Sequence, residues 1–383
     1  IKPCIILLGV SMKLETFDLE RIQSLWENRV DINLTESGLH PYSLKELLPD
    51  TEIDQLLNLR LGYGQTNGSI ELRQTIATLY PGANEDNVIV TNGSAEANFI
   101  AIWSLLNPGD ELVLMYPNYM QISGLADAFG VRIKPFYLKE ALNWAPDIKE
   151  LEQLITPKTK MISVCNPNNP TGATFSDVIM DEIIALAKKH DVWILADEIY
   201  RGAELDGNVI STFHGKYEKV LVNGGLSKAY GLPGLRLGWL VGPQLEIENA
   251  WKYHDYTTIG PGILSNEIAN LVLKSPLREK VLARSRKILN ENLLILTEWI
   301  QNHKDLFHFI PPKAGGMAFI RYNADINSRE LSTRLRKEKS VFVVDGDCYG
   351  MDHYLRIGFG CEKDSLIRGL NLLDELLLEI LKK

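Results

Sequence analysis

Short apolar runs recur along the chain and are separated by polar turns or by segments in which apolar residues repeat at helical spacing. Each run is too short for a helix and is followed by a turn, so each reads as a buried strand. These predicted strands occupy residues 88–91, 111–115, 160–164, 192–196 and 219–222. Between two of them, residues 177–190 carry apolar residues at the spacing of one helix face. Alternating strands and helices are typical of an α/β fold with a parallel sheet.

Several chemically active side chains stand directly after these predicted strands. Asn169, Asp197 and Lys228 each follow the carboxyl end of an apolar run. In an open α/β sheet the carboxyl ends of parallel strands share one edge, and ligands bind there. We therefore expect these three side chains to converge in space. Taken one at a time, each could also be an ordinary turn residue or helix cap.

The stretch from Asn223 to Trp239 combines many glycines with one lysine and one arginine. Glycine allows the backbone to turn tightly and to approach a ligand closely. An amine among apolar neighbours is a nucleophile that forms a Schiff base with a carbonyl. Arg236 offers a planar charged group suited to phosphate. Lys228 and Arg236 together are what an enzyme needs to hold pyridoxal phosphate (PLP).

A second anion site is predicted where the strand 88–91 runs into a helix. Gly93, Ser94 and Ala95 stand at this helix N-terminus, where free backbone N–H groups and the helix dipole favour an anion. We assign them to the phosphate. An ordinary serine cap is the alternative.

Composition narrows the class of protein. With 45% apolar and 23% charged residues the chain resembles an ordinary globular enzyme. Its net charge of −9 argues against a nucleic-acid partner and gives no reason to expect an anionic membrane surface. Four cysteines lack metal-ligand spacing, which predicts free thiols in a reducing compartment, with the cytoplasm as the default, and no metal site: Cys4, Cys165, Cys348 and Cys361.

A chain of 383 residues is expected to form more than one domain. A long helix predicted at 278–301 leads into a C-terminal part with strand signals at 317–321 and 341–344 and a closing helix from Ser365. A short amphipathic helix is predicted at 18–29. The apolar run at 2–10 is too short to span a membrane. Whether residues 1–11 belong to the native protein, or Met12 is the start, is left open.

Three motifs resemble those of the class I and II PLP-dependent aminotransferases, which have the fold of type I PLP enzymes. They are the segment from Ser227 to Gly238, the string Asn-Pro-Asn-Asn-Pro-Thr-Gly at 166–172, and Ala-Asp-Glu-Ile-Tyr at 196–200. Further matches occur at Gly38, at 63–73 and at Arg356, in the family's order. Several matches in order are hard to obtain by chance.

The resemblance implies a large domain with a mostly parallel seven-stranded sheet between helices, and a smaller α+β domain built from both ends of the chain. We expect an N-terminal segment at 1–45, a PLP-binding domain at 46–275 and a C-terminal domain at 276–383.

The resemblance also implies roles for individual residues. Lys228 would hold PLP as an internal aldimine and move the proton as general acid and base, and Asp197 would keep the ring nitrogen protonated. Asn169 would donate a hydrogen bond to the ring hydroxyl, Tyr200 would hydrogen-bond the ring oxygen, and Tyr119 would stack on the ring. Ser227 and Arg236 would contact the phosphate. The substrate carboxylate would be bound by Arg356, with Gly38 and Asn169 lining its pocket.

Tyr63 matches the family's tyrosine that reaches the cofactor phosphate of the partner subunit, which implies a homodimer with shared sites. The implied reaction moves an amino group between an L-amino acid and a 2-oxo acid in a ping-pong scheme. The sequence leaves acidic, aromatic and basic amino donors open.

One departure from the family pattern leaves other reactions open. Many relatives have serine three residues before the lysine, where this chain has Gly225. Ser94, Ser227 or Tyr63 could replace the lost phosphate contact. The segment 253–258 also has no role in the common pattern. The alternative is β-elimination, β-replacement or cyclisation of an amino acid by an enzyme of the capreomycidine-synthase kind. A regulatory module with this fold is disfavoured, because Lys228 and Asp197 are both present.

Overall fold

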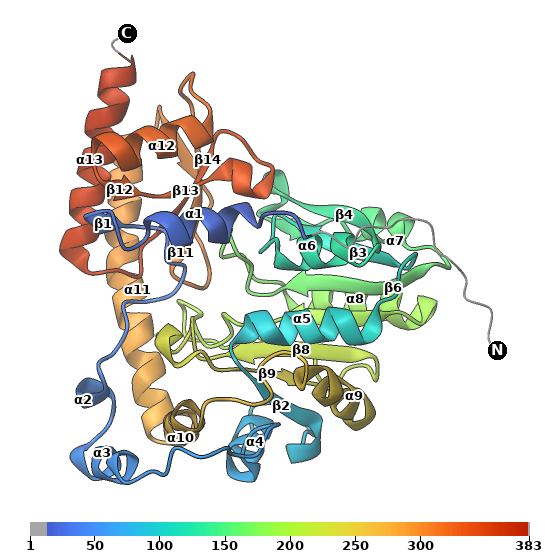
Figure 1. Cartoon of the computed structure of the whole chain (residues 1–383). Helices are drawn as coiled ribbons and strands as arrows, with labels where there is room; N and C mark the ends of the chain where they lie inside the picture. The colour runs from blue at the N-terminus through green and yellow to red at the C-terminus, as the bar shows by residue number, and fades with distance from the viewer. Residues whose placement is uncertain (1–13, 382–383) are drawn as a thin grey trace.

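A computed structural model describes residues 14–381 of the chain (Figure 1). The apolar run at 2–10, the alternative start at Met12 and Cys4 lie outside the described residues. No helix in the described part of the chain is long and apolar enough to cross a membrane.

The larger sheet has eight strands in the order β2-β9-β8-β7-β6-β3-β4-β5. The strands from β8 to β4 in this order are parallel, whereas β2, β9 and β5 pair antiparallel. The predicted α/β fold class is confirmed, and the sheet gains a two-residue strand, β5, at one edge. The strands are β2 Val88–Thr91, β3 Glu111–Tyr116, β4 Arg132–Lys139, β5 Ala145–Pro146, β6 Thr159–Cys165, β7 Trp193–Asp197, β8 Val220–Gly225 and β9 Gly238–Val241.

Helices cover both faces of this sheet because alternate residues of each strand point to opposite sides. In β3, Leu112 and Leu114 pack in the apolar cluster that includes α5, α6 and α9, whereas Val113 and Met115 pack in the cluster that includes α8. The helix predicted at 177–190 is confirmed as α8. The helices that flank the sheet are α5 Ser94–Leu105, α6 Gln121–Ala128, α7 Ile148–Leu154, α8 Asp177–His190 and α9 Gln244–His254.

A smaller antiparallel sheet, in the order β10-β11-β14-β13, belongs to the C-terminal part of the chain. The prediction of one strand at 341–344 is wrong. Val341 and Phe342 pair with β1, whereas Val344 and Asp345 pair with β14, so the chain passes from one sheet to another at Val343. The elements are α11 Leu277–Asn302, β10 Phe307–Phe309, β11 Met317–Tyr322, α12 Ser328–Glu338, β12 Val341–Phe342, β13 Val344–Asp345, β14 Tyr354–Gly358 and α13 Lys363–Leu381.

The N-terminal segment joins this C-terminal part. Strand β1 (Ile32–Asn33) pairs with β12, and in Figure 1 the blue β1 lies beside the red α13. The segment continues over three glycines whose missing side chains make room for it: a Cβ on Gly316, Gly358 or Gly360 would lie about 2 Å from a backbone oxygen of Glu36 or Gly38. The segment 32–38 therefore packs with the C-terminal part of the chain, and the predicted domain boundaries remain predictions.

The other helices connect these parts. Helix α1 ends at Trp26, earlier than the predicted 29. Long α11 runs along one side of the molecule in Figure 1. The remaining elements are α1 Asp18–Trp26, α2 Leu44–Leu47, α3 Asp50–Leu57, α4 Ile70–Ala77 and α10 Ile263–Val272, with 3₁₀ turns η1 Glu85–Asn87, η2 Glu140–Leu142, η3 Pro233–Leu235 and η4 Gly346–Tyr349.

Candidate active site

A cavity of about 520 Å³ opens at the carboxyl edge of β6, β7 and β8. The structure brings most of the predicted site residues together in its lining: Ser94, Ala95, Tyr119, Asn169, Asp197, Tyr200, Ser227, Lys228, Arg236 and Arg356. They come from strands, loops and helices far apart in the sequence. No group of His, Cys, Asp and Glu side chains within residues 14–381 is arranged to hold a metal ion.

Asp197 ends strand β7 and is only 6% exposed. Burial raises the pKa of its carboxyl to about 6, against hydrogen bonds from the Ile199 N–H at 3.1 Å and the Asn98 amide at 3.4 Å that lower it. Asn98 is held in turn by the Asn223 amide at 2.9 Å. These hydrogen bonds, from Asn223 through Asn98 to Asp197, fix a buried carboxylate that a cation in the cavity would stabilise.

The N-terminus of α5 forms an anion cradle. Gly93 caps the helix with φ +82°, and because glycine has no side chain it makes no capping hydrogen bond to the N–H groups of the first turn. The guanidinium of Arg236 lies directly over it, because a Cβ on Gly93 would be 2.6 Å from Arg236 Nη2. A Cβ on Gly238 would be 2.5 Å from the Ser94 nitrogen, so glycine there lets β9 approach the turn. Backbone N–H groups, the helix dipole and a guanidinium thus meet at one end of the cavity.

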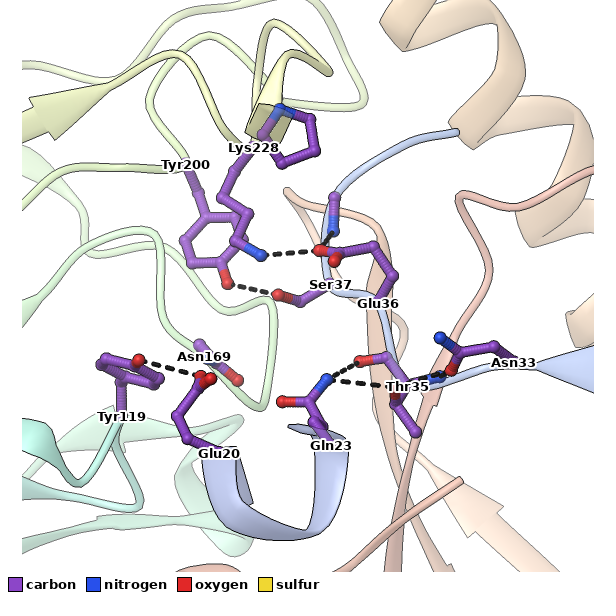
Figure 2. A network of polar contacts seen from close by, with 12 residues as sticks. Glu20, Gln23, Asn33, Thr35, Glu36, Ser37, Tyr119, Asn169, Tyr200 and Lys228 are labelled. Carbon is purple, nitrogen blue, oxygen red and sulfur yellow. Dashed lines mark hydrogen bonds and ion pairs between the residues drawn. The ribbon is translucent and has the colours of Figure 1, made fainter. Parts of the chain in front are cut away.

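Lys228 follows β8, and its amine lies 2.6 Å from Glu36 Oε1. Burial alone would raise the pKa of Glu36, but the charge and hydrogen bond of Lys228 and the Gly38 N–H outweigh it, and the pKa is lowered. The Glu36 side chain remains 43% exposed because it faces the open cavity. Figure 2 shows Lys228 and Tyr200 reaching from one side toward Glu36 and Ser37 on the other.

Two tyrosines of the cavity are oriented by hydrogen bonds. The Tyr200 hydroxyl donates to Ser37 Oγ at 2.8 Å, and the Tyr119 hydroxyl donates to Glu20 Oε1 at 2.9 Å. The Tyr119 ring also meets Phe17 edge-on, with ring centroids 5.0 Å apart. A fixed aromatic ring beside the cavity can stack on a flat ligand.

Arg356 on β14 is fully buried at the other end of the cavity. Its guanidinium donates to Asn169 Oδ1 at 2.9 Å, to the Tyr349 hydroxyl at 2.6 Å and to the Thr35 carbonyl at 2.6 Å. Its Nε has no hydrogen-bond partner among the described residues. A buried guanidinium held in place with a donor to spare is suited to binding a carboxylate.

Three predicted site residues do not line the cavity. Gly38 lies just behind it, where a Cβ would be 3.2 Å from the Ser227 oxygen, and its N–H holds Glu36. Gly93 lies beneath Arg236. Tyr63 is 96% exposed and lies outside the cavity of its own chain.

Gly225, the departure from the family pattern, is closely packed. A Cβ here would lie 2.9 Å from Ile199 Cδ1 and 3.0 Å from the Leu237 carbonyl oxygen. A serine cannot enter without displacing these neighbours, so Ile199 occupies the space that the larger residue would need.

The segment at 253–258, which had no assigned role, binds a side chain in the first turn of α5, next to the anion cradle. His254, Thr257 and Thr258 hydrogen bond to the carboxylate of Glu96, in the first turn of α5. Burial would raise the pKa of Glu96, but these hydrogen bonds and that of the Asn92 N–H lower it to about 2. A carboxylate is thus fixed at the helix N-terminus, where the dipole favours it.

Sequence reasoning missed the residues that the N-terminal segment contributes to the cavity: Glu20, Gln23, Glu27, Glu36 and Ser37. The spacing of Glu20, Gln23 and the C-terminal cap Glu27 places them on one face of α1. That spacing was a readable signal, but a polar helix face is usually solvated. Tyr349, which contacts Arg356, carried no such signal.

Comparison with known proteins matches residues 38–372 to the family described as aminotransferase class I and II. Among curated proteins, the chain is similar to a capreomycidine synthase of Streptomyces vinaceus, with 30% identity over 90% of this chain and 89% of that protein.

Among solved structures, the chain is similar to a PLP-dependent aminotransferase of Streptococcus suis. The TM-score is 0.91 with 32% identity, covering 96% of this chain and 99% of the other. It is also similar to the PLP-dependent cyclase OrfR, with a TM-score of 0.88 and 25% identity, covering 97% of this chain and 99% of that one.

Proposed function

This chain belongs to the class I and II aminotransferases, which use PLP, and from that premise we propose how its residues transfer an amino group between an L-amino acid and a 2-oxo acid. Lys228 carries the cofactor, Asp197 faces the ring nitrogen, and Arg356 binds the substrate carboxylate. The observation that carries the proposal is the position of buried Asp197 in the same cavity as Lys228.

The charged and polar groups of the cavity fit PLP. The anion cradle of Gly93, Ser94, Ala95 and Arg236 is suited to a phosphate, and Gly238 leaves the room that the cradle needs. In the same cavity, the carboxyl of Asp197 is buried with a raised pKa, and a protonated ring nitrogen would be its cationic partner. Tyr119 and Asn169 also line this cavity.

When bound, PLP supplies an electron sink for the carbanion at the substrate Cα. The protein's own residues supply the rest. Arg356 fixes the substrate by its α-carboxylate, with Asn169 and Tyr349 holding the guanidinium. This orientation would present the Cα–H bond to Lys228, whose Nζ would take the proton as general base and give it back as general acid. Asp197 would keep the ring nitrogen protonated, and that cation would offset the negative charge that develops at Cα.

The same groups serve both halves of the reaction. Arg356 binds the carboxylate of the amino donor first and of the 2-oxo acid acceptor second, so the two substrates use one site in turn. The rate measured against one substrate should therefore give parallel double-reciprocal lines as the other is varied. Lys228→Ala should abolish turnover while the cradle still binds PLP. Intersecting lines, or a Lys228→Ala variant with near-normal activity, would rule out the proposal.

A second candidate reaction is elimination or cyclisation on the same scaffold. It is favoured by the similarity to a protein named capreomycidine synthase and to a structure titled as a PLP-dependent cyclase. The proton would leave Cα in the same way, and a β-substituent would leave next. Such a reaction needs no 2-oxo acid acceptor, so product formation without one distinguishes it from transamination.

We further propose that the protein is a homodimer in which Tyr63 reaches the partner's phosphate site. The support is that Tyr63 is 96% exposed in the single chain and lies outside the cavity of its own chain, so it is available to a partner subunit. The free thiols Cys165, Cys348 and Cys361 suit a reducing compartment such as the cytoplasm.

A further inference from the structure

One wall of the cavity is acidic. Glu20, Glu27 and Glu36 all line it, with Gln23 between the first two. Glu20 and Gln23 project from α1, and Glu27 is the residue at its C-terminal cap. Figure 2 shows Glu20 and Gln23 on the side of the cavity away from Lys228, with the amide oxygen of Gln23 directed toward Glu20.

Two of these carboxylates, those of Glu20 and Glu27, have no ionic partner in the part of the chain that the structure describes. Within residues 14–381, Glu20 and Glu27 make no ion pair, and Glu20 only accepts the hydrogen bond of the Tyr119 hydroxyl at 2.9 Å. Burial, and then the charges of Glu36 and Glu20, raise the pKa of Glu27. The group is therefore mutually repulsive, and a cation placed among its members would relieve the repulsion.

The cations of the cavity are committed elsewhere when the enzyme works. Under the proposed function Arg236 holds the phosphate and Arg356 the substrate carboxylate. Lys228 now pairs with Glu36 at 2.6 Å, but it must leave that partner to act on the cofactor and on Cα. At that point three carboxylates face the substrate with no protein cation assigned to them.

We propose that the amino donor carries a cationic side chain, a guanidinium or an ammonium, which the acidic wall binds. The inference rests on the proposed function, because it places the α-carboxylate at Arg356 and the Cα at Lys228. The side chain then extends toward α1. A guanidinium suits this wall best, since its planar set of donors can meet carboxylate oxygens and the Gln23 amide oxygen together. An acidic side chain would be repelled.

The test compares amino donors that differ in charge but hardly in shape. The PLP-loaded enzyme is mixed in single turnovers with L-arginine or with L-citrulline, its neutral analogue, and the loss of the cofactor's visible band is followed. L-Lysine against L-norleucine is a second pair, and L-glutamate reports the opposite charge. We expect the ratio of rate constant to half-saturating concentration to favour each cationic member by about tenfold or more, and the preference to shrink at high salt.

Two isosteric variants locate the effect. Glu27→Gln and Glu20→Gln should each lower the arginine-to-citrulline ratio about threefold or more, mainly through the half-saturating concentration of arginine. Glutamine at 20 can still accept the Tyr119 hydrogen bond. Glu182→Gln is the matched control, since Glu182 is exposed on α8 and should leave the ratio unchanged.

The outcomes separate this inference from the proposed function. Equal rates with arginine and citrulline, faster reaction with glutamate, or an unchanged ratio in both variants would overturn the inference and leave transamination standing. A cofactor band that no amino acid converts would overturn the proposed function itself, and the inference with it.

Discussion

The amine of Lys228 lies 2.6 Å from the carboxylate of Glu36, a residue that reaches the cavity from the other end of the fold. Lys228 follows β8 of the large sheet, whereas Glu36 belongs to the N-terminal segment that packs on Gly316, Gly358 and Gly360. The pair therefore ties the two parts of the molecule together across the reaction site. It also occupies the lysine amine before the cofactor arrives.

Removing the charge of Glu36 should free the Lys228 amine from its ion pair. For Glu36→Gln we therefore expect the apo enzyme to capture PLP covalently faster than the wild type does. The rate of appearance of the cofactor's visible band checks this, with Glu182→Gln as control. A rate equal to that of the wild type, or lower, would contradict it.

The buried carboxyl of Asp197 predicts an unusual stability profile for the apo enzyme. Its pKa is raised from 3.8 to about 6, so the native state binds this proton more tightly than the unfolded chain does. The apo enzyme should lose on the order of 3 kcal/mol as pH rises from about 4 to above 6, because the charge is then buried without a cation.

Asp197→Asn isolates that effect. Because asparagine cannot ionise, the thermal midpoint of the apo variant should rise relative to that of the apo wild type as pH increases from 4.5 to 7.5. PLP should then stabilise the variant less than it stabilises the wild type at pH 7.5. A constant difference between the two midpoints across this pH range would speak against a buried, titrating Asp197.

Gly225→Ser should damage the protein even though it restores the family's usual residue. The new side chain meets Ile199 Cδ1 at 2.9 Å and the Leu237 oxygen at 3.0 Å. We expect a loss of about 1–3 kcal/mol in stability, typical of overpacking. Gly124→Ser is the control, because a Cβ there meets nothing within 4 Å.

A second substitution shows whether Ile199 is the cause. Ile199→Val removes the clashing Cδ1, so the double variant should lose less stability than the two single losses combined. Thermal unfolding and PLP affinity of all four proteins complete the cycle. Strict additivity, or a stable Gly225→Ser variant that binds PLP more tightly, would contradict the packing argument.

Tyr63 predicts complementation between subunits. If it acts in the partner's site, a mixture of Lys228→Ala and Tyr63→Ala chains forms hybrid dimers in which one site has both residues intact. We expect re-equilibrated equal mixtures to recover about a quarter of wild-type activity, from the statistics of random pairing. Activity no greater than the sum of the two unmixed variants would argue for sites within single chains.

Local sequence was sufficient for the elements that carry the cofactor residues. The strands before Asn169, Asp197 and Lys228 are continuous apolar runs, and parallel strands share an edge, so convergence of these residues followed from topology. The helix at 177–190 was predictable to the residue because Ser176 caps its start and Asp191, with φ +56°, ends it.

The rest of the site depends on contacts between distant segments. Glu36 reaches Lys228 because Gly316, Gly358 and Gly360 leave room for the backbone of Glu36 and Gly38, and none of these contacts is visible in a local pattern. The polar face of α1 looked like a solvated face until the fold placed it over the cavity. The division of 341–344 between two sheets was decided by partners β1 and β14, not by its apolar residues.

The most direct test of the central claim is the visible spectrum of the PLP-loaded protein as amino acids are added one at a time. We expect a cationic amino acid to convert the cofactor's visible band to that of pyridoxamine phosphate, and a 2-oxo acid to restore it. Release of ammonia with the original band regenerated would instead indicate elimination. A protein that acquires no cofactor band at all would contradict the assignment of Lys228 and Asp197.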